Sequence, residues 1–105
     1  MHYFDHEKLD AYKVALEVAR WVNAAEFPRG WAWLRDQVLR SSGSCVLNIA
    51  EGRARGGDAG RNHYRIALGS AAETCAALDI LPLDGAAEQQ AKLRRVGAML
   101  SGLAR

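Results

Sequence analysis

Apolar residues recur at helical spacing along four segments of the chain, and Pro or Gly interrupts the pattern between them. The segments span residues 5–25, 31–53, 58–81 and 86–103. The strict apolar and polar alternation that marks strands is almost absent. Short connections make successive helices antiparallel neighbours. We therefore predict an all-α fold, an antiparallel up-down four-helix bundle that forms one domain over residues 1–105.

Composition excludes several classes of protein. Of the 105 residues, 50% are hydrophobic and 25% are charged, which is a globular balance. No apolar run approaches the roughly 20 residues of a membrane span, and the N-terminus has no apolar signal segment. Cys45 and Cys75 lie on apolar stripes and lack metal-ligand spacing. We expect a cytoplasmic protein with no membrane partner, no metal and no cofactor.

The first segment, residues 5–25, carries two apolar stripes. One consists of Leu9, Tyr12, Leu16 and Ala19, and the other of Ala11, Val14, Val18, Trp21 and Ala25. A helix of a monomeric bundle needs only one such stripe. We therefore expect this helix to be covered from two sides.

The second segment, residues 31–53, carries a polar stripe in addition to its apolar one. The apolar stripe consists of Leu34, Val38, Ser42, Cys45 and Ile49. The polar stripe recurs at spacings of three and four residues and consists of Trp33, Gln37, Arg40, Ser44, Asn48 and Glu51. Gly43 lies in mid-helix at a cost of about 1 kcal/mol, which a close helix approach would explain.

The polar stripe predicts a network between the second and third helices. The Gly-rich turn centres near residues 56–57, so residues that face each other should have numbers that sum to about 113. Arg40 then faces Glu73. We predict an ion pair between them, because a carboxylate among apolar neighbours needs a partner. Beside this pair we predict a network of Gln37, Ser44, Asn48, Glu51 and Asn62.

Catalysis by paired carboxylates is a more specific interpretation of Glu51 and Glu73 than a structural network. At a rise of 1.5 Å per residue, the predicted register leaves their Cα atoms roughly 15 Å apart. That separation is too large for a two-carboxylate glycosidase site. We therefore favour a structural network, name no catalytic residue and expect no enzyme activity.

The connection between the second and third helices is the best candidate for a ligand site. Residues 52–61 read GRARGGDAGR, and backbone amides where a helix begins favour phosphate. The segment is not a P-loop, because the Lys-Ser/Thr ending is missing. The net charge of +2 is small, but residues 31–65 hold six arginines against three acids. The candidates for contacts to the RNA or DNA backbone are Arg53, Arg55, Arg61 and Arg65. The alternative is a flexible turn with solvated arginines.

Two short motifs, NIAEG at residues 48–52 and GSAAE at residues 69–73, stand out along the chain. Together with Gln37, Arg40 and Tyr64, they resemble the 23S rRNA-intervening-sequence proteins, a family of four-helix-bundle proteins. The resemblance covers nearly the whole chain. It implies an up-down bundle that assembles as a homopentameric ring and to which no catalytic residues are attributed. A related protein, the accessory variability protein of diversity-generating retroelements, binds nucleic acid and a reverse transcriptase.

Two functions stay open at this point. The first is a non-enzymatic oligomeric scaffold that binds nucleic acid or an RNA-handling protein partner through its arginines. The second is a protein-interaction ring with no nucleic-acid role. The salt dependence of binding distinguishes the two functions, because phosphate contacts release counterions and therefore weaken steeply as the salt concentration rises.

Overall fold

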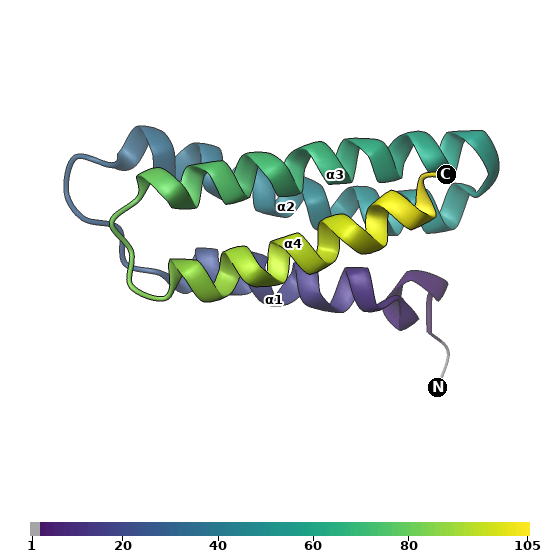
Figure 1. Cartoon of the computed structure of the whole chain (residues 1–105), viewed down its shortest axis with the longest axis horizontal. Coiled ribbons are helices and arrows are strands. Elements are labelled where there is room, and N and C mark those ends of the chain that lie inside the picture. Colours follow the sequence, from purple (N-terminus) through teal and green to yellow (C-terminus); the bar gives the residue numbers. More distant parts are fainter. Residues whose placement is uncertain (1–2) are drawn as a thin grey trace.

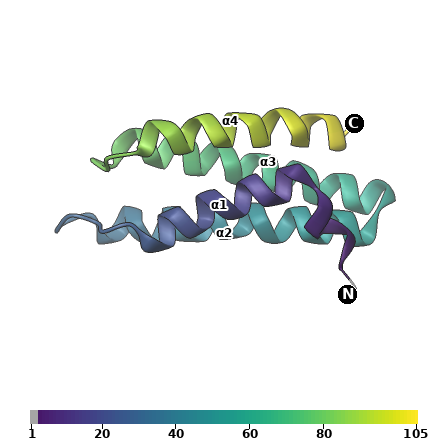
Figure 2. The same ribbon diagram turned by 90° about the horizontal axis from the view of Figure 1, so that it is seen from below.

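The chain folds into four α-helices that run up and down beside one another (Figure 1, Figure 2). The computed structural model describes residues 3–105. The helices are α1 (Asp10–Ala24), α2 (Ala32–Arg55), α3 (Gly57–Ile80) and α4 (Ala86–Leu103), and a short 3-10 helix, η1 (Asp5–Lys8), precedes them. No strand occurs in this part of the chain, so the all-α prediction is confirmed.

The helix bounds differ from the predicted segments mainly at the N-terminus. Residues 5–8 do not continue α1 but form η1, and Leu9 between them is extended, with φ and ψ of −76° and 128°. Helices α2 and α3 meet at Gly56 and Gly57, whose φ values are +64° and +58°. Side chains with a Cβ atom rarely adopt such values, so glycine allows this sharp reversal.

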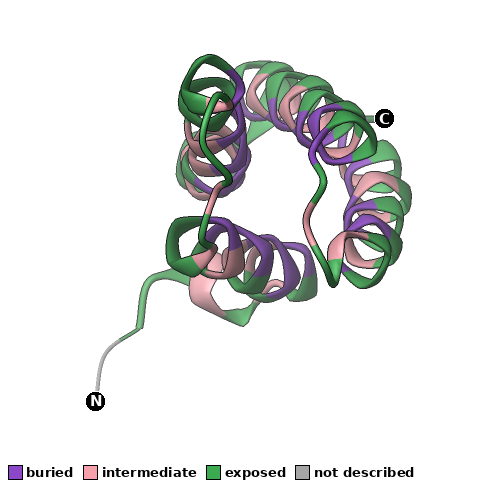
Figure 3. Cartoon of the chain, turned by 90° about the vertical axis from the view of Figure 1, so that its left-hand side faces the viewer, coloured by how far each residue is buried: buried purple, intermediate pink, exposed green. Residues whose placement is uncertain are grey.

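The core is formed by the faces that the four helices turn toward one another (Figure 3). The predicted apolar stripe of α2 is buried as expected. On α3 the buried residues are Gly60, Tyr64, Ala67, Ala71, Thr74, Ala77 and Leu78. Leu68 and Cys75 are only partly buried. Small side chains on the buried face let α3 pack closely on α2, and this pair shares the most extensive contact in the fold.

The close approach of α2 and α3 occurs beside the turn. A Cβ atom on Gly60 would lie 2.5 Å from the carbonyl oxygen of Gly52, and one on Gly52 would lie 2.8 Å from Cε1 of Tyr64. Neither position has room for a side chain. The close approach that we expected at Gly43 is absent, because a Cβ atom there would meet open space.

Helix α1 packs against α2 and α4. Its second stripe is buried at Ala11, Val14 and Val18, whereas Tyr12 and Leu16 of the first stripe are only partly buried. The expectation that α1 is covered from two sides is therefore not met within one chain, and it stays a prediction for an assembly. None of the described helices is long and apolar enough to cross a membrane.

Candidate nucleic-acid interface

One end of the bundle gathers the four candidate arginines. The α2–α3 turn, the described start of the chain and the end of α4 all lie at this end (Figure 1, Figure 2). Residues 51–65 hold four arginines but only two carboxylates, Glu51 and Asp58. The guanidinium group of Arg65 reaches the chain end and donates a 3.1 Å hydrogen bond to the carbonyl oxygen of Ala104. The structure thus brings the four arginines to one end of the molecule.

Two of these arginines are paired with the two carboxylates. Nε of Arg55 lies 2.7 Å from Oε1 of Glu51, and Arg61 pairs with Asp58. The hydrogen bond and the charge of Arg55 lower the pKa of Glu51 below its ordinary value. Exposed pairs of this kind contribute little stability, so phosphate can compete for both arginines.

Arg53 differs from the other three. It is exposed, and it makes no ion pair or side-chain hydrogen bond with any residue of the described range 3–105. Its guanidinium group therefore keeps its full donor capacity for a carboxylate or a phosphate. Among the predicted site residues, Arg53 is the arginine best placed to bind an anionic ligand.

A glycine-rich cleft of about 330 Å³ lies next to Arg53. Its lining includes Gly56, Gly57 and Gly60, with Arg53 and Arg61 beside them. Within residues 3–105 no side chain caps the start of α3, so the amides of its first turn, beside this cleft, lack a side-chain acceptor. Asp5 also lines the cleft and adds a negative charge to it.

A polar network joins α2 and α3, but part of it differs from the prediction. Asn48 donates to the hydroxyl of Ser44 at 3.1 Å, and its amide oxygen lies 2.9 Å from Nδ1 of His63. The hydroxyl of Ser70 donates to that of Ser44 at 3.0 Å. Ser44 and Asn48 therefore join a network as predicted, whereas Glu51 bonds only to Arg55 on its own helix.

The predicted ion pair between Arg40 and Glu73 does not form. Both side chains are exposed, and neither makes an ion pair or side-chain hydrogen bond within residues 3–105. Gln37 and Asn62 are also exposed and stay outside the network. The reason is that the stripe containing Asn62 and Glu73 faces solvent, so the carboxylate stays hydrated and needs no partner.

The predicted register of α2 against α3 is correct to within two residues, but the positions of α3 that contact α2 differ from the predicted ones. Ser44 bonds to Ser70 and Asn48 to His63, pairs whose numbers sum to 114 and 111. Ser41 and Thr74, which the sequence reasoning missed, form a buried pair that sums to 115. The sequence nearly indicated these residues, because Thr74 and Ser70 directly follow positions 73 and 69, which were predicted to face α2.

The family model of the 23S rRNA-intervening sequence protein matches residues 7–102. The chain belongs to this family. No curated protein sequence matches it.

In this 23S rRNA-intervening sequence protein, the NIAEG motif shapes the α2–α3 end of the bundle. Asn48 bonds to His63, Ile49 is fully buried, and Gly52 provides the close approach to α3. Each of these roles is structural. The arginines that follow the motif are positioned by it, because the close approach fixes where α2 ends and α3 begins.

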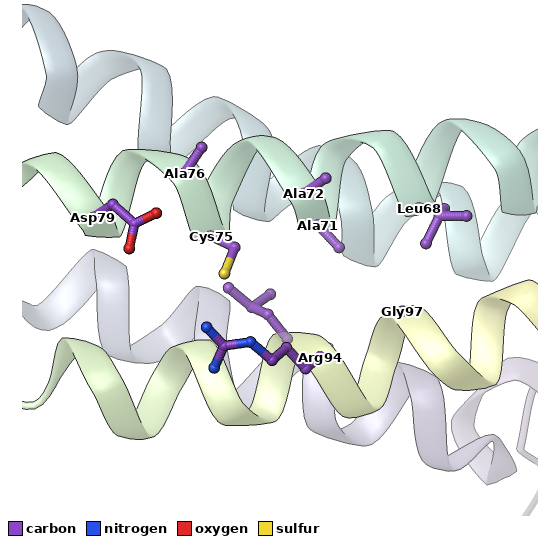
Figure 4. Close-up of a pocket in the computed structure, with 9 residues that line it drawn as sticks. Leu68, Ala71, Ala72, Cys75, Ala76, Asp79, Arg94 and Gly97 are labelled. Atoms are coloured by element: carbon purple, nitrogen blue, oxygen red, sulfur yellow. The ribbon is translucent and has the colours of Figure 1, made fainter.

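Another cavity lies between α3 and α4, with a volume of about 380 Å³ (Figure 4). Its lining is mostly apolar and includes Leu68 and Cys75. Asp79 at its edge accepts a 2.7 Å hydrogen bond from Gln90. Polar groups that could orient a small ligand are few here, so this cavity is a weaker candidate than the arginine end.

The two cysteines have different environments. Burial raises the pKa of the Cys45 thiol from its ordinary value of 9.0 to about 12, so it stays protonated near neutral pH. Cys75 is only partly buried, and both thiols are free. Within residues 3–105, no three side chains of the metal-binding types lie together.

Proposed function

We propose that this protein is a non-catalytic oligomeric scaffold that binds the backbone of RNA or DNA through the arginine-bearing end of each bundle. The observation that carries the proposal is the gathering of Arg53, Arg55, Arg61 and Arg65 at one end. Two of them, Arg53 and Arg61, line a glycine-rich cleft there. Guanidinium groups and helix-start amides are both suited to phosphate oxygens. We place the protein in the cytoplasm, where free thiols stay reduced.

The arrangement of charges supports a backbone contact rather than a metabolite site. The four arginines lie around an open end of the bundle, and only Glu51 and Asp58 offset them within residues 51–65. Phosphates along a strand can engage several separate arginines, and the affinity then depends on counterion release. Such contacts fix the position of the nucleic acid without reading its sequence.

Self-association is supported by exposed apolar residues on the outer face of α2 and α3. Leu47 is 71% exposed and Ile66 is 44% exposed, and these two residues face each other in the observed register. Trp33 and Ile80 are also exposed and lie two heptads from Leu47 and Ile66. Exposed apolar residues on one outer face suit contact with another copy of the chain, and the charged residues Arg40 and Glu73 lie midway between them.

The proposed assembly is a homopentameric ring in which this α2–α3 face contacts the next copy. A ring repeats the arginine end around one rim. Repetition converts several weak phosphate contacts into a stronger combined one.

A second candidate function is favoured by the same exposed apolar face. The ring could bind a protein partner through it and have no nucleic-acid role. This candidate predicts that binding of the partner depends on Leu47 and Ile66, and that oligonucleotides do not bind at any salt concentration.

A charge-reversal pair tests the proposal. Arg53→Glu combined with Arg55→Glu should abolish binding of a labelled single-stranded RNA, measured by fluorescence anisotropy at low and moderate salt. The matched control is Arg94→Glu with Arg95→Glu, which changes the net charge equally at exposed positions of α4. The proposal predicts that only the first pair loses binding. Equal losses in both variants, or none in the first, would contradict the assignment.

A further inference from the structure

A second cavity at the arginine end is lined by aromatic side chains. Its volume is about 310 Å³, and its lining is Tyr3, Phe4, Asp5 and His6 from the start of the chain with Arg53 and Ala54 from α2. Phe4 is 74% exposed and Tyr3 is 58% exposed. Aromatic rings exposed to this degree contribute little to the core, but they offer faces on which another planar group can stack.

The ring of Phe4 is held in place by a row of aromatic contacts. It stacks on the ring of His6, with centroids 5.9 Å apart and planes within 12° of parallel. His6 in turn meets Tyr12 of α1 edge-on, with centroids 4.6 Å apart. The row connects the exposed ring to the bundle, so a ligand that stacks on it loses less entropy in ordering the site.

Arg53 connects this aromatic cavity to the glycine-rich cleft. Arg53 and Asp5 line both cavities. A planar group in the aromatic cavity would therefore lie next to a guanidinium group that has no carboxylate partner. Beyond Arg53, the cleft offers Arg61 and the start of α3. A stacking surface followed by a phosphate-binding surface matches the order of base and phosphate in a nucleotide.

We propose that this end of the bundle binds single-stranded nucleic acid, with an unpaired base stacked on Phe4 and an adjoining phosphate on Arg53. The proposal rests on the proposed function and specifies its ligand. Bases in a duplex are already stacked on each other, so their faces are closed to Phe4. Base stacking on an aromatic side chain tolerates any sequence. Asp5 can accept hydrogen bonds from base N–H groups, and it disfavours a phosphate at its own position.

The test compares three labelled probes with equal lengths of strand. They are a single-stranded DNA of mixed sequence, the same DNA as a duplex, and a strand whose central sugars carry no bases. Phe4→Leu should weaken binding of the first probe about tenfold and leave binding of the other two unchanged. Phe4→Trp should restore the affinity for the single strand. Because Phe4 is mostly exposed, neither change should affect the helical circular dichroism.

Phe27→Leu is the matched control, because it makes the same change of side chain at the opposite end of α2 from Arg53. Phe27 lies in the connection between α1 and α2 and is only partly buried against the core. Its replacement should leave the affinity for all three probes unchanged.

The outcomes separate this proposal from the one it rests on. If the strand without bases binds as tightly as the intact strand and Phe4→Leu has no effect, base stacking is wrong and backbone binding stands. If none of the probes binds, and the labelled single-stranded RNA does not bind either, both proposals fall. Fluorescence quenching of 2-aminopurine in the single strand, lost in Phe4→Leu, would support stacking directly.

Discussion

The hydroxyl oxygens of Ser41 and Thr74 lie 2.7 Å apart in the buried contact between α2 and α3. The Thr74 hydroxyl also donates to the carbonyl oxygen of Ser70 at 2.8 Å. The Ser41 hydroxyl also lies 3.4 Å from the carbonyl oxygen of Val38, so either hydroxyl can donate within the pair. The pair connects the two helices that form the arginine end, and together with the Ser44–Ser70 and Asn48–His63 bonds it specifies their register.

Ser41→Ala and Thr74→Val should each lower the free energy of unfolding by about 1–3 kcal/mol, because each leaves a buried polar group without its partner. The double variant should lose less than the sum of the two, by about 1 kcal/mol. Urea denaturation of the four proteins measures this coupling. Additive losses would show that the two hydroxyls do not act as a pair. Ser101→Ala, at an exposed serine on α4, serves as a control that should change little.

Glycine has opposite roles at two positions of α2. Gly52→Ala should destabilise the protein by about 1–3 kcal/mol, because the new Cβ atom would meet the Tyr64 ring at 2.8 Å. Gly43→Ala should stabilise it by about 1 kcal/mol, because the position is helical and open. Thermal unfolding of both variants checks the prediction. A loss of stability in Gly43→Ala would show that this position is covered in the assembly.

Replacement of two adjacent glutamines on α4 should change the stability of the protein in opposite directions. Oε1 of Gln89 is buried and has no hydrogen-bond partner within residues 3–105. Nε2 of Gln90 donates to the Cys75 carbonyl oxygen at 2.9 Å and to Asp79 at 2.7 Å. Gln89→Met should therefore raise the free energy of unfolding by about 1 kcal/mol, and Gln90→Met should lower it by about 1–3 kcal/mol. A change in the free energy of unfolding with the same sign in both variants would contradict this account.

Burial of the Cys45 thiol predicts a dependence of stability on pH. Its pKa rises from 9.0 to about 12 on folding, so above pH 9 the unfolded chain loses this proton and the folded chain keeps it. Stability from this group is complete below pH 9 and is lost as the pH rises toward 12, by about 1.4 kcal/mol per pH unit. The difference between the wild type and Cys45→Ala should show this slope. The same dependence of stability on pH in both proteins would contradict the effect of burying the Cys45 thiol.

Reactivity of the thiols provides an independent check on the same environments. Cys75 is partly buried beside the α3–α4 cavity, whereas Cys45 is 1% exposed. A thiol reagent should therefore modify Cys75 in the folded protein and reach Cys45 only after unfolding. Mass spectrometry of the modified peptides identifies the site. Modification of Cys45 before Cys75 would mean that α2 and α3 separate readily.

Periodicity was sufficient to predict four helices and the register of α2 on α3. The apolar stripe of α2 was also predictable, because Val38, Cys45 and Ile49 recur at helical spacing and all three are buried. On α3, by contrast, alanine occurs on several faces, so spacing alone could not select the buried one. The fold buries Ala67 and Thr74 and leaves Leu68 partly exposed at the α3–α4 cavity.

The candidate site was predictable in its residues but not in its contacts. The spacing of four residues between Glu51 and Arg55 indicates a pair on one helix. The bond from Arg65 to Ala104 depends on where α4 ends, and the cavity beside Phe4 depends on how η1 turns back toward α2. Both are tertiary features that local spacing does not encode.

Light scattering with and without a short single-stranded RNA, at low and high salt, tests the central claim most directly. The account predicts a particle of five times the 11.5 kDa chain that gains mass with RNA at low salt and loses it at high salt. A particle with the mass of one chain would contradict the oligomer. A particle whose mass RNA leaves unchanged at both salt concentrations would contradict nucleic-acid binding and favour a protein partner.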